Sequence, residues 1–184
     1  MVNVVVETTP NPATMKFLPG CSVMNTGTVN YLSPDDANDA PLVRQLFEID
    51  GIAGVFLGAD FISVAKKSAF DWRSLEPVVA ETISMFFKSG EPVVTEAAVQ
   101  DEQPDDDDDE TVTQIKELLD TRVRPSVAMD GGDIVYRGFE RGVVYLSLQG
   151  ACIGCPSSNA TLKMGVENLL KHYVPDVLRV EAVE

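Results

Sequence analysis

The chain is poor in the side chains that most metal and covalent chemistry uses. Its 184 residues include three cysteines and one histidine. A small, odd number of cysteines argues against a secreted scaffold built on disulfides. A zinc site within one chain needs four ligands, and this inventory offers few ways to supply them.

Basic residues are also scarce. Fourteen Lys and Arg stand against 29 Asp and Glu, which gives a formal net charge of −15. This balance excludes the basic patches that a nucleic-acid backbone requires. Eight of the acidic residues fall between positions 101 and 110, so the remainder of the chain is only mildly acidic.

Long apolar runs are missing as well. No run approaches the roughly 20 residues that span a bilayer, so we predict no membrane partner. The start, Met1–Thr8, lacks the basic region of a signal peptide and the Arg/Ser-rich character of a transit peptide. We therefore expect a cytoplasmic protein of the bacterial cytosol, or one of the mitochondrial matrix if a leader has been removed.

Two patterned blocks flank the acidic stretch. Periodicity in residues 1–92 predicts a first domain with strands over 2–6, 13–18, 55–57 and 61–64, a further short strand within 22–31, and helices over 40–48 and 71–90. Asp71 is the expected N-cap and Gly90 the expected end of the second helix. Residues 93–110 cannot bury enough apolar area to fold, so we predict that they form a solvated linker. The predicted fold class is two small mixed α/β (α+β) domains joined by an acidic flexible linker.

The second domain is predicted over residues 111–184. Its pattern indicates a helix capped by Thr111 and stopped by Pro125, a hairpin of strands over 134–139 and 143–149, a helix beginning at Pro156, and a closing strand over 178–182. At about 74 residues such a domain is marginal on core packing alone. Metal binding or dimerisation can contribute to its stability.

Cys152 and Cys155 stand in a glycine-flanked turn between the second strand of this hairpin and the following helix. Proline is favoured at the first helical position, so Pro156 places Cys155 at the N-cap. The helix dipole and free amides there favour thiolate over thiol. Two such thiolates suit metal binding or redox chemistry.

Several roles for the pair are open. Covalent haem attachment needs a histidine after the second cysteine and is excluded by Pro156. Cys21 lies in the other domain, and His172 lies roughly 25 Å along the helix, so neither completes a zinc site within the chain. A thiol–disulfide exchange site is the strongest rival, although we predict no parallel strand–helix–strand pattern around the pair. Buried structural thiols are the plainer alternative.

Symmetry offers a further role. A twofold axis beside the turn brings together four thiolates, which is the ligand set of a [4Fe–4S] cluster and also of zinc. A cluster held between subunits near the surface is releasable, as a carrier requires.

The residues around the pair strongly resemble the C-terminal domain of NifU. The matching stretches are Gly150-Ala-Cys-Ile-Gly-Cys-Pro-Ser-Ser158, 161–163, 165–170, 172–175 and Asp130-Gly-Gly-Asp133. The first block resembles the N-terminal domain of Nfu-type proteins through residues 7–14, 16–20, 47–51 and 60–64. The resemblance implies an iron–sulfur cluster carrier that receives clusters from the assembly machinery and delivers them to apo-proteins, without enzymatic activity.

The resemblance also implies that Cys152 and Cys155 ligate the cluster. Together with the symmetry argument, this leads us to expect a [4Fe–4S] cluster that bridges a homodimer, and we predict no catalytic residues. We expect Cys21 to be a free structural thiol and His172 a surface residue, and Asp130 and Asp133 to shape the turn rather than bind metal. The first domain is a candidate docking module. A thiol–disulfide exchange protein using the same cysteine pair is the alternative function.

Overall fold

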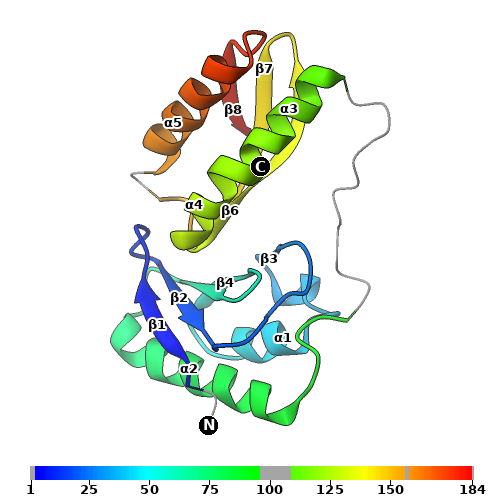
Figure 1. Ribbon diagram of the computed structural model, residues 1–184. Coiled ribbons are helices and arrows are strands. Elements are labelled where there is room, and N and C mark those ends of the chain that lie inside the picture. Colours follow the sequence, from blue (N-terminus) through cyan, green and yellow to red (C-terminus); the bar gives the residue numbers. More distant parts are fainter. Residues whose placement is uncertain (1–2, 96–108, 156–157, 184) are drawn as a thin grey trace.

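The computed structural model describes residues 3–95, 109–155 and 158–183. Helices and strands are mixed in two domains, as predicted (Figure 1). Most of the predicted linker falls on 96–108, outside the described residues. The elements of the first domain are β1 (Val5–Thr8), β2 (Thr14–Leu18), β3 (Val29–Tyr31), η1 (Pro34–Asp36), α1 (Pro41–Phe47), β4 (Ile52–Leu57), β5 (Ile62–Lys66) and α2 (Trp72–Ser89).

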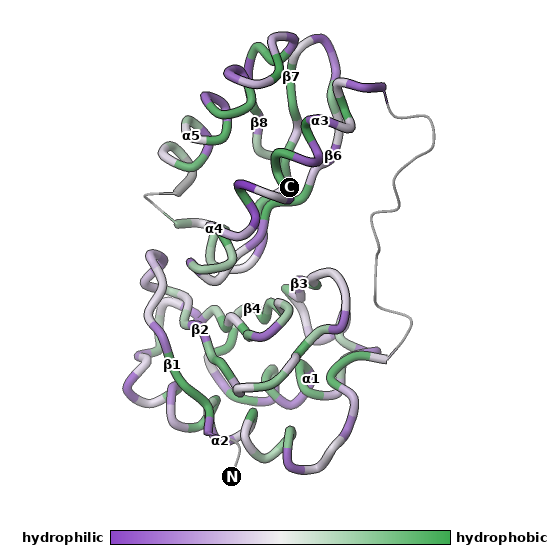
Figure 2. The backbone as a smooth tube through the Cα atoms, viewed as in Figure 1, coloured by the Kyte–Doolittle hydropathy of each residue, from purple (hydrophilic) through white to green (hydrophobic). Residues whose placement is uncertain are grey.

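The first domain is an antiparallel sheet with helices on one face. The strand order is β1-β2-β5-β4-β3, and α1 and α2 cover the lower face in Figure 1. Side chains alternate between the two faces of a strand. The strand side chains that face the helices form the first core together with the helices' apolar side chains. Its members include Phe17, Val55, Leu57, Ile62 and Val64 of the strands and Ile83 of α2. Figure 2 shows apolar residues recurring along the strands and helices of both domains.

The ends of α2 confirm the predicted capping residues. The Asp71 carboxylate accepts a hydrogen bond from the Arg73 amide, and Gly90 ends the helix with a left-handed φ of 75°. The chain beyond α2 still packs on the first domain. Val93 is buried against the first core, and the Thr95 amide donates to the Asp39 carbonyl. Contacts of the first domain therefore extend three residues past the predicted boundary at 92.

The second domain contains α3 (Glu110–Leu118), the π-helical turn η2 (Leu119–Val123), α4 (Arg124–Met129), β6 (Gly132–Glu140), β7 (Val143–Gly150), α5 (Ser158–Tyr173) and β8 (Arg179–Val183). Its core packs α3, η2 and α5 against the sheet. The members include Ile115, Leu119, Ile134, Val144, Cys152, Val166 and Leu170.

Two predictions about the first helix of this domain are wrong. Asp109 precedes the helix, and Thr111 lies inside it, where its hydroxyl bonds the Asp176 carboxylate. Pro125 does not stop the helical run. A proline in a helix interior removes a hydrogen bond and clashes with the preceding turn. The wide turn of η2 interrupts the α-helical ladder, so Pro125 falls in the first turn of α4, where its missing N–H is tolerated.

The strands of the second domain correct another expectation. β6 and β7 form the predicted antiparallel hairpin, in which Arg141 and Gly142 both have positive φ values, as a type I′ turn requires. However, β7 and β8 are parallel. The helix α5 carries the chain back along the sheet before β8 begins, so β7–α5–β8 is a parallel strand–helix–strand unit. The cysteine pair lies between the strand and the helix, as predicted, but the prediction that no parallel strand–helix–strand unit surrounds it is wrong.

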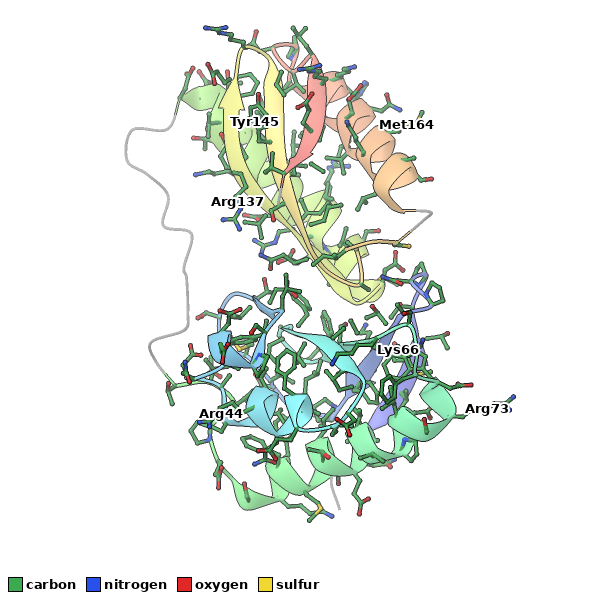
Figure 3. The ribbon with its side chains drawn as sticks, turned by 180° about the vertical axis from the view of Figure 1, so that it is seen from behind. Arg44, Lys66, Arg73, Arg137, Tyr145 and Met164 are labelled. Carbon is green, nitrogen blue, oxygen red and sulfur yellow. The ribbon has the colours of Figure 1, made fainter. Side chains whose placement is uncertain are left out.

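We predict that Leu170→Ala lowers the free energy of unfolding of the second domain by about 2–5 kcal/mol, because it leaves a cavity in the core. Leu170 is 0% exposed. The measurement is urea unfolding followed by far-UV circular dichroism. Met164 on the same helix is 64% exposed (Figure 3), so Met164→Ala should change stability by no more than about 0.5 kcal/mol. Equal effects of the two substitutions would contradict this packing.

Candidate metal-binding site

The cysteine loop, residues 150–155, follows directly from β7. Gly150 and Gly154 have left-handed φ values of 61° and 67°, which favour glycine at both positions. Hydrogen bonds tie the loop to the sheet: the Ala151 amide donates to the Gly131 carbonyl and the Cys152 amide to the Gln149 carbonyl. The predicted helix start at Pro156 lies outside the described residues, and the described part of α5 begins at Ser158.

The neighbouring turn explains the glycines of the Asp130-Gly-Gly-Asp133 motif. Gly132 begins β6 and pairs with Gly150 at the end of β7. A Cβ on Gly132 would lie 2.5 Å from the Cys152 Sγ and 2.8 Å from the Gln149 carbonyl oxygen. A side chain therefore cannot be added at position 132 without moving Cys152. This close approach fixes the cysteine loop against the sheet.

Both cysteines of the loop are buried, and neither forms a disulfide. Cys152 is 4% exposed and Cys155 is 2% exposed. They line one cavity of about 520 Å³, together with residues of η2, α4 and α5 and with Pro10 of the first domain. The predicted pair is thus brought to a single concave site. Most of the other lining side chains are apolar, and they include Val123, Val127, Leu162, Val166 and Leu169.

The environment of Cys152 favours the neutral thiol. Burial is the main cause that raises its pKa to about 12, and the negative charges near it, including those of Asp130 and Asp133, act in the same direction. The prediction of an activated thiolate is therefore wrong for Cys152 in this arrangement. The loss of hydration on burial outweighs the influence of the nearby helix terminus.

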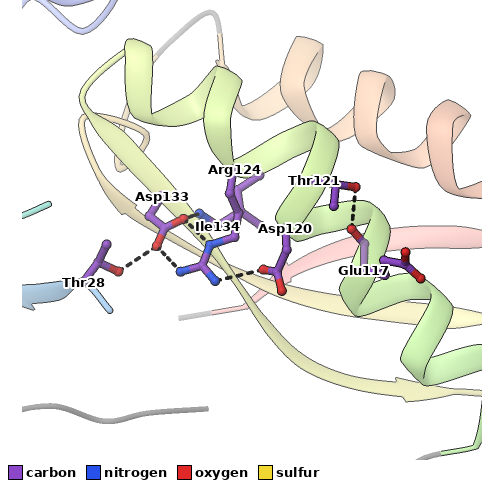
Figure 4. A network of polar contacts seen from close by, with 7 residues as sticks. All are labelled: Thr28, Glu117, Asp120, Thr121, Arg124, Asp133 and Ile134. Carbon is purple, nitrogen blue, oxygen red and sulfur yellow. Dashed lines mark hydrogen bonds and ion pairs between the residues drawn. The ribbon is translucent and has the colours of Figure 1, made fainter. Parts of the chain in front are cut away.

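A buried ion pair supports the loop from the side of α4 and β6 (Figure 4). Asp133 accepts hydrogen bonds from Arg124 Nε at 2.9 Å and Nη2 at 2.8 Å, from the Thr28 hydroxyl at 2.6 Å and from the Ile134 amide at 2.8 Å. Asp120 binds the same guanidinium at 3.0 Å. The hydrogen bonds that Arg124 donates to Asp133 are the main cause that raises the pKa of Arg124. Asp133 thus joins α4 to the start of β6.

Sequence reasoning missed Arg124, because its contact with Asp133 depends on how α4 folds back on β6. It also missed Asn11. The Asn11 side-chain amide donates to the carbonyls of Ala151 at 3.1 Å and Ile153 at 2.9 Å. These partners lie 140 and 142 residues away in sequence, so no local pattern could have indicated them.

The remaining candidate residues lie apart from this pair. Cys21 is free, as predicted, but it is exposed, so the prediction of a structural packing role is wrong. His172 is exposed in the last turn of α5, which confirms the predicted surface position. Within the described ranges, no group of three or more His, Cys, Asp or Glu residues is placed to hold a metal ion. Across those ranges, no helix combines the length and apolar character needed to cross a membrane.

Both halves of the chain match known families. Residues 4–90 match the family described as scaffold protein Nfu/NifU N terminal, and residues 115–181 match the NifU-like domain. A Homo sapiens protein named "NFU1 iron-sulfur cluster scaffold homolog, mitochondrial" is 51% identical over 178 residues, which cover 96% of this chain and 70% of that protein. The protein of the same name from Drosophila sechellia is 49% identical, with coverage of 96% and 63%. The chain thus spans about two thirds of these relatives' length.

Solved structures also show partial likeness. A NifU-like protein from Saccharomyces cerevisiae has a TM-score of 0.48 at 22% identity, covering 52% of this chain and 87% of its own. A Staphylococcus aureus protein has a TM-score of 0.40 at 26% identity, covering 44% of this chain and 98% of its own. Because both scores lie below 0.5, the family assignment rests on the sequence matches.

The burial of the pair predicts unequal cysteine reactivity. In the native, metal-free chain, we expect iodoacetamide to modify exposed Cys21 well before Cys152 and Cys155, because alkylation requires an accessible thiolate. Mass spectrometry of peptides after timed quenching measures the three rates. In urea, where burial is lost, the rates should converge. Native alkylation of Cys152 as fast as that of Cys21 would contradict the buried, neutral thiol.

We further predict that Asp133→Asn lowers the free energy of unfolding by about 2 kcal/mol, because Arg124 then lies half-buried without its full counter-charge. Urea unfolding followed by circular dichroism measures the change. Arg179 and Glu181 form an exposed pair at 3.0 Å, so Glu181→Gln is the matched control and should cost well under about 1 kcal/mol. A neutral effect of Asp133→Asn would contradict a structural role for the buried pair.

Proposed function

The chain belongs to the Nfu/NifU family of scaffold proteins, and on that premise we propose that it carries an iron–sulfur cluster on Cys152 and Cys155. One observation carries the proposal. The two cysteines within the NifU-like match form no disulfide and line the same cavity. Cysteine thiolates are the usual protein ligands of iron–sulfur clusters.

The proposed cluster is [4Fe–4S], shared by two chains. Four thiolates complete the ligand set of such a cluster, and one cysteine loop supplies two. The full sequence holds only one further cysteine and one histidine. Cys21 is an exposed residue of the other domain, and His172 lies at the far end of α5. A second copy of the cysteine loop is therefore the proposed source of the missing ligands, which makes the cluster-bound protein a homodimer.

The chain's own residues set the chemistry of loading. Because burial keeps Cys152 protonated, ligation must release its proton. The apolar lining limits water around the ligands. The proposed transfer is an exchange of cysteine ligands, with the assembly machinery as donor and apo-proteins as recipients, so the chain acts as a carrier rather than an enzyme.

One observation favours the rival function of thiol–disulfide exchange. A C-x-x-C pair at the strand-to-helix junction of a parallel unit is also the position of redox dithiols. The raised pKa of Cys152 weighs against this function, because the thiolate is the attacking species in exchange. The relatives reported above are named as mitochondrial proteins, and the cytoplasmic location expected for this chain stays a prediction.

Anaerobic reconstitution tests the proposal. The wild-type chain should take up roughly two iron and two labile sulfide per chain, which corresponds to one four-iron cluster per pair of chains. Cys152→Ser or Cys155→Ser should reduce uptake at least about tenfold, because each removes two of the four thiolates from the dimer. Iron and sulfide assays with absorbance spectra measure the uptake. Cys21→Ser is the matched control and should bind as the wild type does.

The same experiment separates the two functions. A carrier should hand its cluster to an apo-protein and return to the metal-free state. Retention of zinc with no uptake of iron would contradict the proposal. A reversible disulfide between the two cysteines, together with reductase activity, would instead support the rival.

A further inference from the structure

The first domain has a sheet face that its own helices leave uncovered. Side chains alternate along a strand, so Lys16, Phe56 and Ser63 lie on the face opposite to Phe17, Val55 and Ile62 of the first core. These three residues are nevertheless buried, with Phe56 only 1% exposed. The second domain lies over this face (Figure 1). The open face of the sheet is therefore a docking surface for the second domain.

This face contacts the base of the cysteine loop. The Ser63 hydroxyl donates to the Gly131 carbonyl at 2.6 Å, and the Lys16 amine donates to the Met129 carbonyl at 3.3 Å. The Phe56 ring packs on Gly150 so closely that a Cβ there would lie 2.9 Å from the ring. The docking surface thus contacts both segments that hold Cys152 in place, which are the turn at residues 129–132 and the start of the cysteine loop at Gly150.

Asn11 holds the loop itself. Its amide nitrogen bridges the carbonyls of Ala151 and Ile153, the residues on either side of Cys152. Its side-chain oxygen accepts a hydrogen bond from the Ala13 amide at 3.0 Å, which orients the side chain. Pro10, the preceding residue, lines the cavity that both cysteines line. The turn that carries these two residues therefore lies at the cluster-ligating side of the loop.

The hydrogen bonds described between the domains all have the same direction. Side chains of Asn11, Lys16, Thr28 and Ser63 donate, and oxygens of the second domain accept. Three of the acceptor carbonyls belong to the cysteine loop or to the glycine turn that packs against it. The first domain thus contacts the backbone of this loop and of the turn beside it through side-chain donors.

We propose that the first domain caps the cysteine loop of the cluster-free chain, with Asn11 as the latch, and separates from it when two chains share a cluster. This inference rests on the proposed function. The loop of a second chain must approach the same two thiols, and Pro10, next to Asn11 in the chain, lines the cavity that contains them. The cap and the second copy therefore compete for one surface. The cap keeps the empty thiols shielded, and loading a cluster requires its release.

Asn11→Asp tests the latch. It keeps the oxygen that accepts from Ala13 but replaces the amide donor with a second oxygen, which faces the two loop carbonyls without a hydrogen atom. In the cluster-free Asn11→Asp chain with both domains, we expect iodoacetamide to modify Cys152 and Cys155 about tenfold faster than in the wild type, as the loss of two hydrogen bonds implies. Reconstitution with iron and sulfide should also proceed faster.

Asn38→Asp is the matched control, because it introduces the same charge at an exposed position of the first domain. It should leave both rates at their wild-type values. Ser63→Ala is a second test without any change of charge, and it should raise the alkylation rates in the same direction by a smaller factor. Fluorescence of Trp72, the single tryptophan of the chain, reports whether each variant keeps the first domain folded.

Wild-type alkylation rates in folded Asn11→Asp and Ser63→Ala would overturn the cap. If Asn11→Asp fails to fold, the alkylation rates of Ser63→Ala alone decide: faster rates support the cap, and wild-type rates overturn it. The alkylation rates need no metal, so they report on the cap even if the wild-type chain takes up no iron. Absence of iron uptake by the wild type would instead contradict the proposed function. The two failures are therefore distinguishable.

Discussion

The close packing of the cysteine loop against the end of the β6–β7 hairpin is the constraint on which the rest of the structure depends. Gly132 and Gly150 pair across the two strands, and the sulfur of Cys152 occupies the space that a side chain on Gly132 would need. This contact buries the thiol in the core of the second domain. Burial in turn raises the pKa of Cys152 and leaves it protonated until iron displaces the proton from the sulfur.

The first domain also restrains the cysteine loop, through contacts from its sheet and from the turn at Asn11. Its helices cover one face of its sheet, while the other face and the turn at Asn11 contact the backbone around Cys152. In the account proposed here, loading must deprotonate the thiols, bring a second loop to them and displace this contact. Each of these three steps opposes loading, so the chain without a cluster keeps its cysteines shielded when few clusters are available. A carrier benefits from this arrangement, because its ligands are protected between one delivery and the next.

Local physical chemistry predicted much of the fold. Asp71 and Gly90 define α2 through capping alone, and the alternating residues of β6 and β7 with the Arg141-Gly142 turn define the hairpin. The cysteine pair was evident because its spacing and glycine flanks are local as well. These features depend on neighbours a few residues apart, which the sequence displays directly.

Tertiary contacts account for the rest. The π-helical turn before Pro125 depends on how the helical run packs, and the parallel direction of β8 depends on the crossover of α5. The pKa of Cys152 follows from burial, which no local pattern encodes, so the helix terminus alone gave the wrong direction. Asn11 reaches the loop across 140 residues of sequence. Contacts of this kind become visible only when both domains are folded and placed together.

The central claim is that the cysteine loop is half of a cluster site. Native mass spectrometry of the anaerobically reconstituted wild-type chain tests it most directly, because the mass gives protein, iron and sulfide together. We expect a species of two chains with four iron and four sulfide atoms, which reverts to single chains when a chelator removes the cluster. A single chain that retains metal on its own, or a dimer that forms without any, would contradict it.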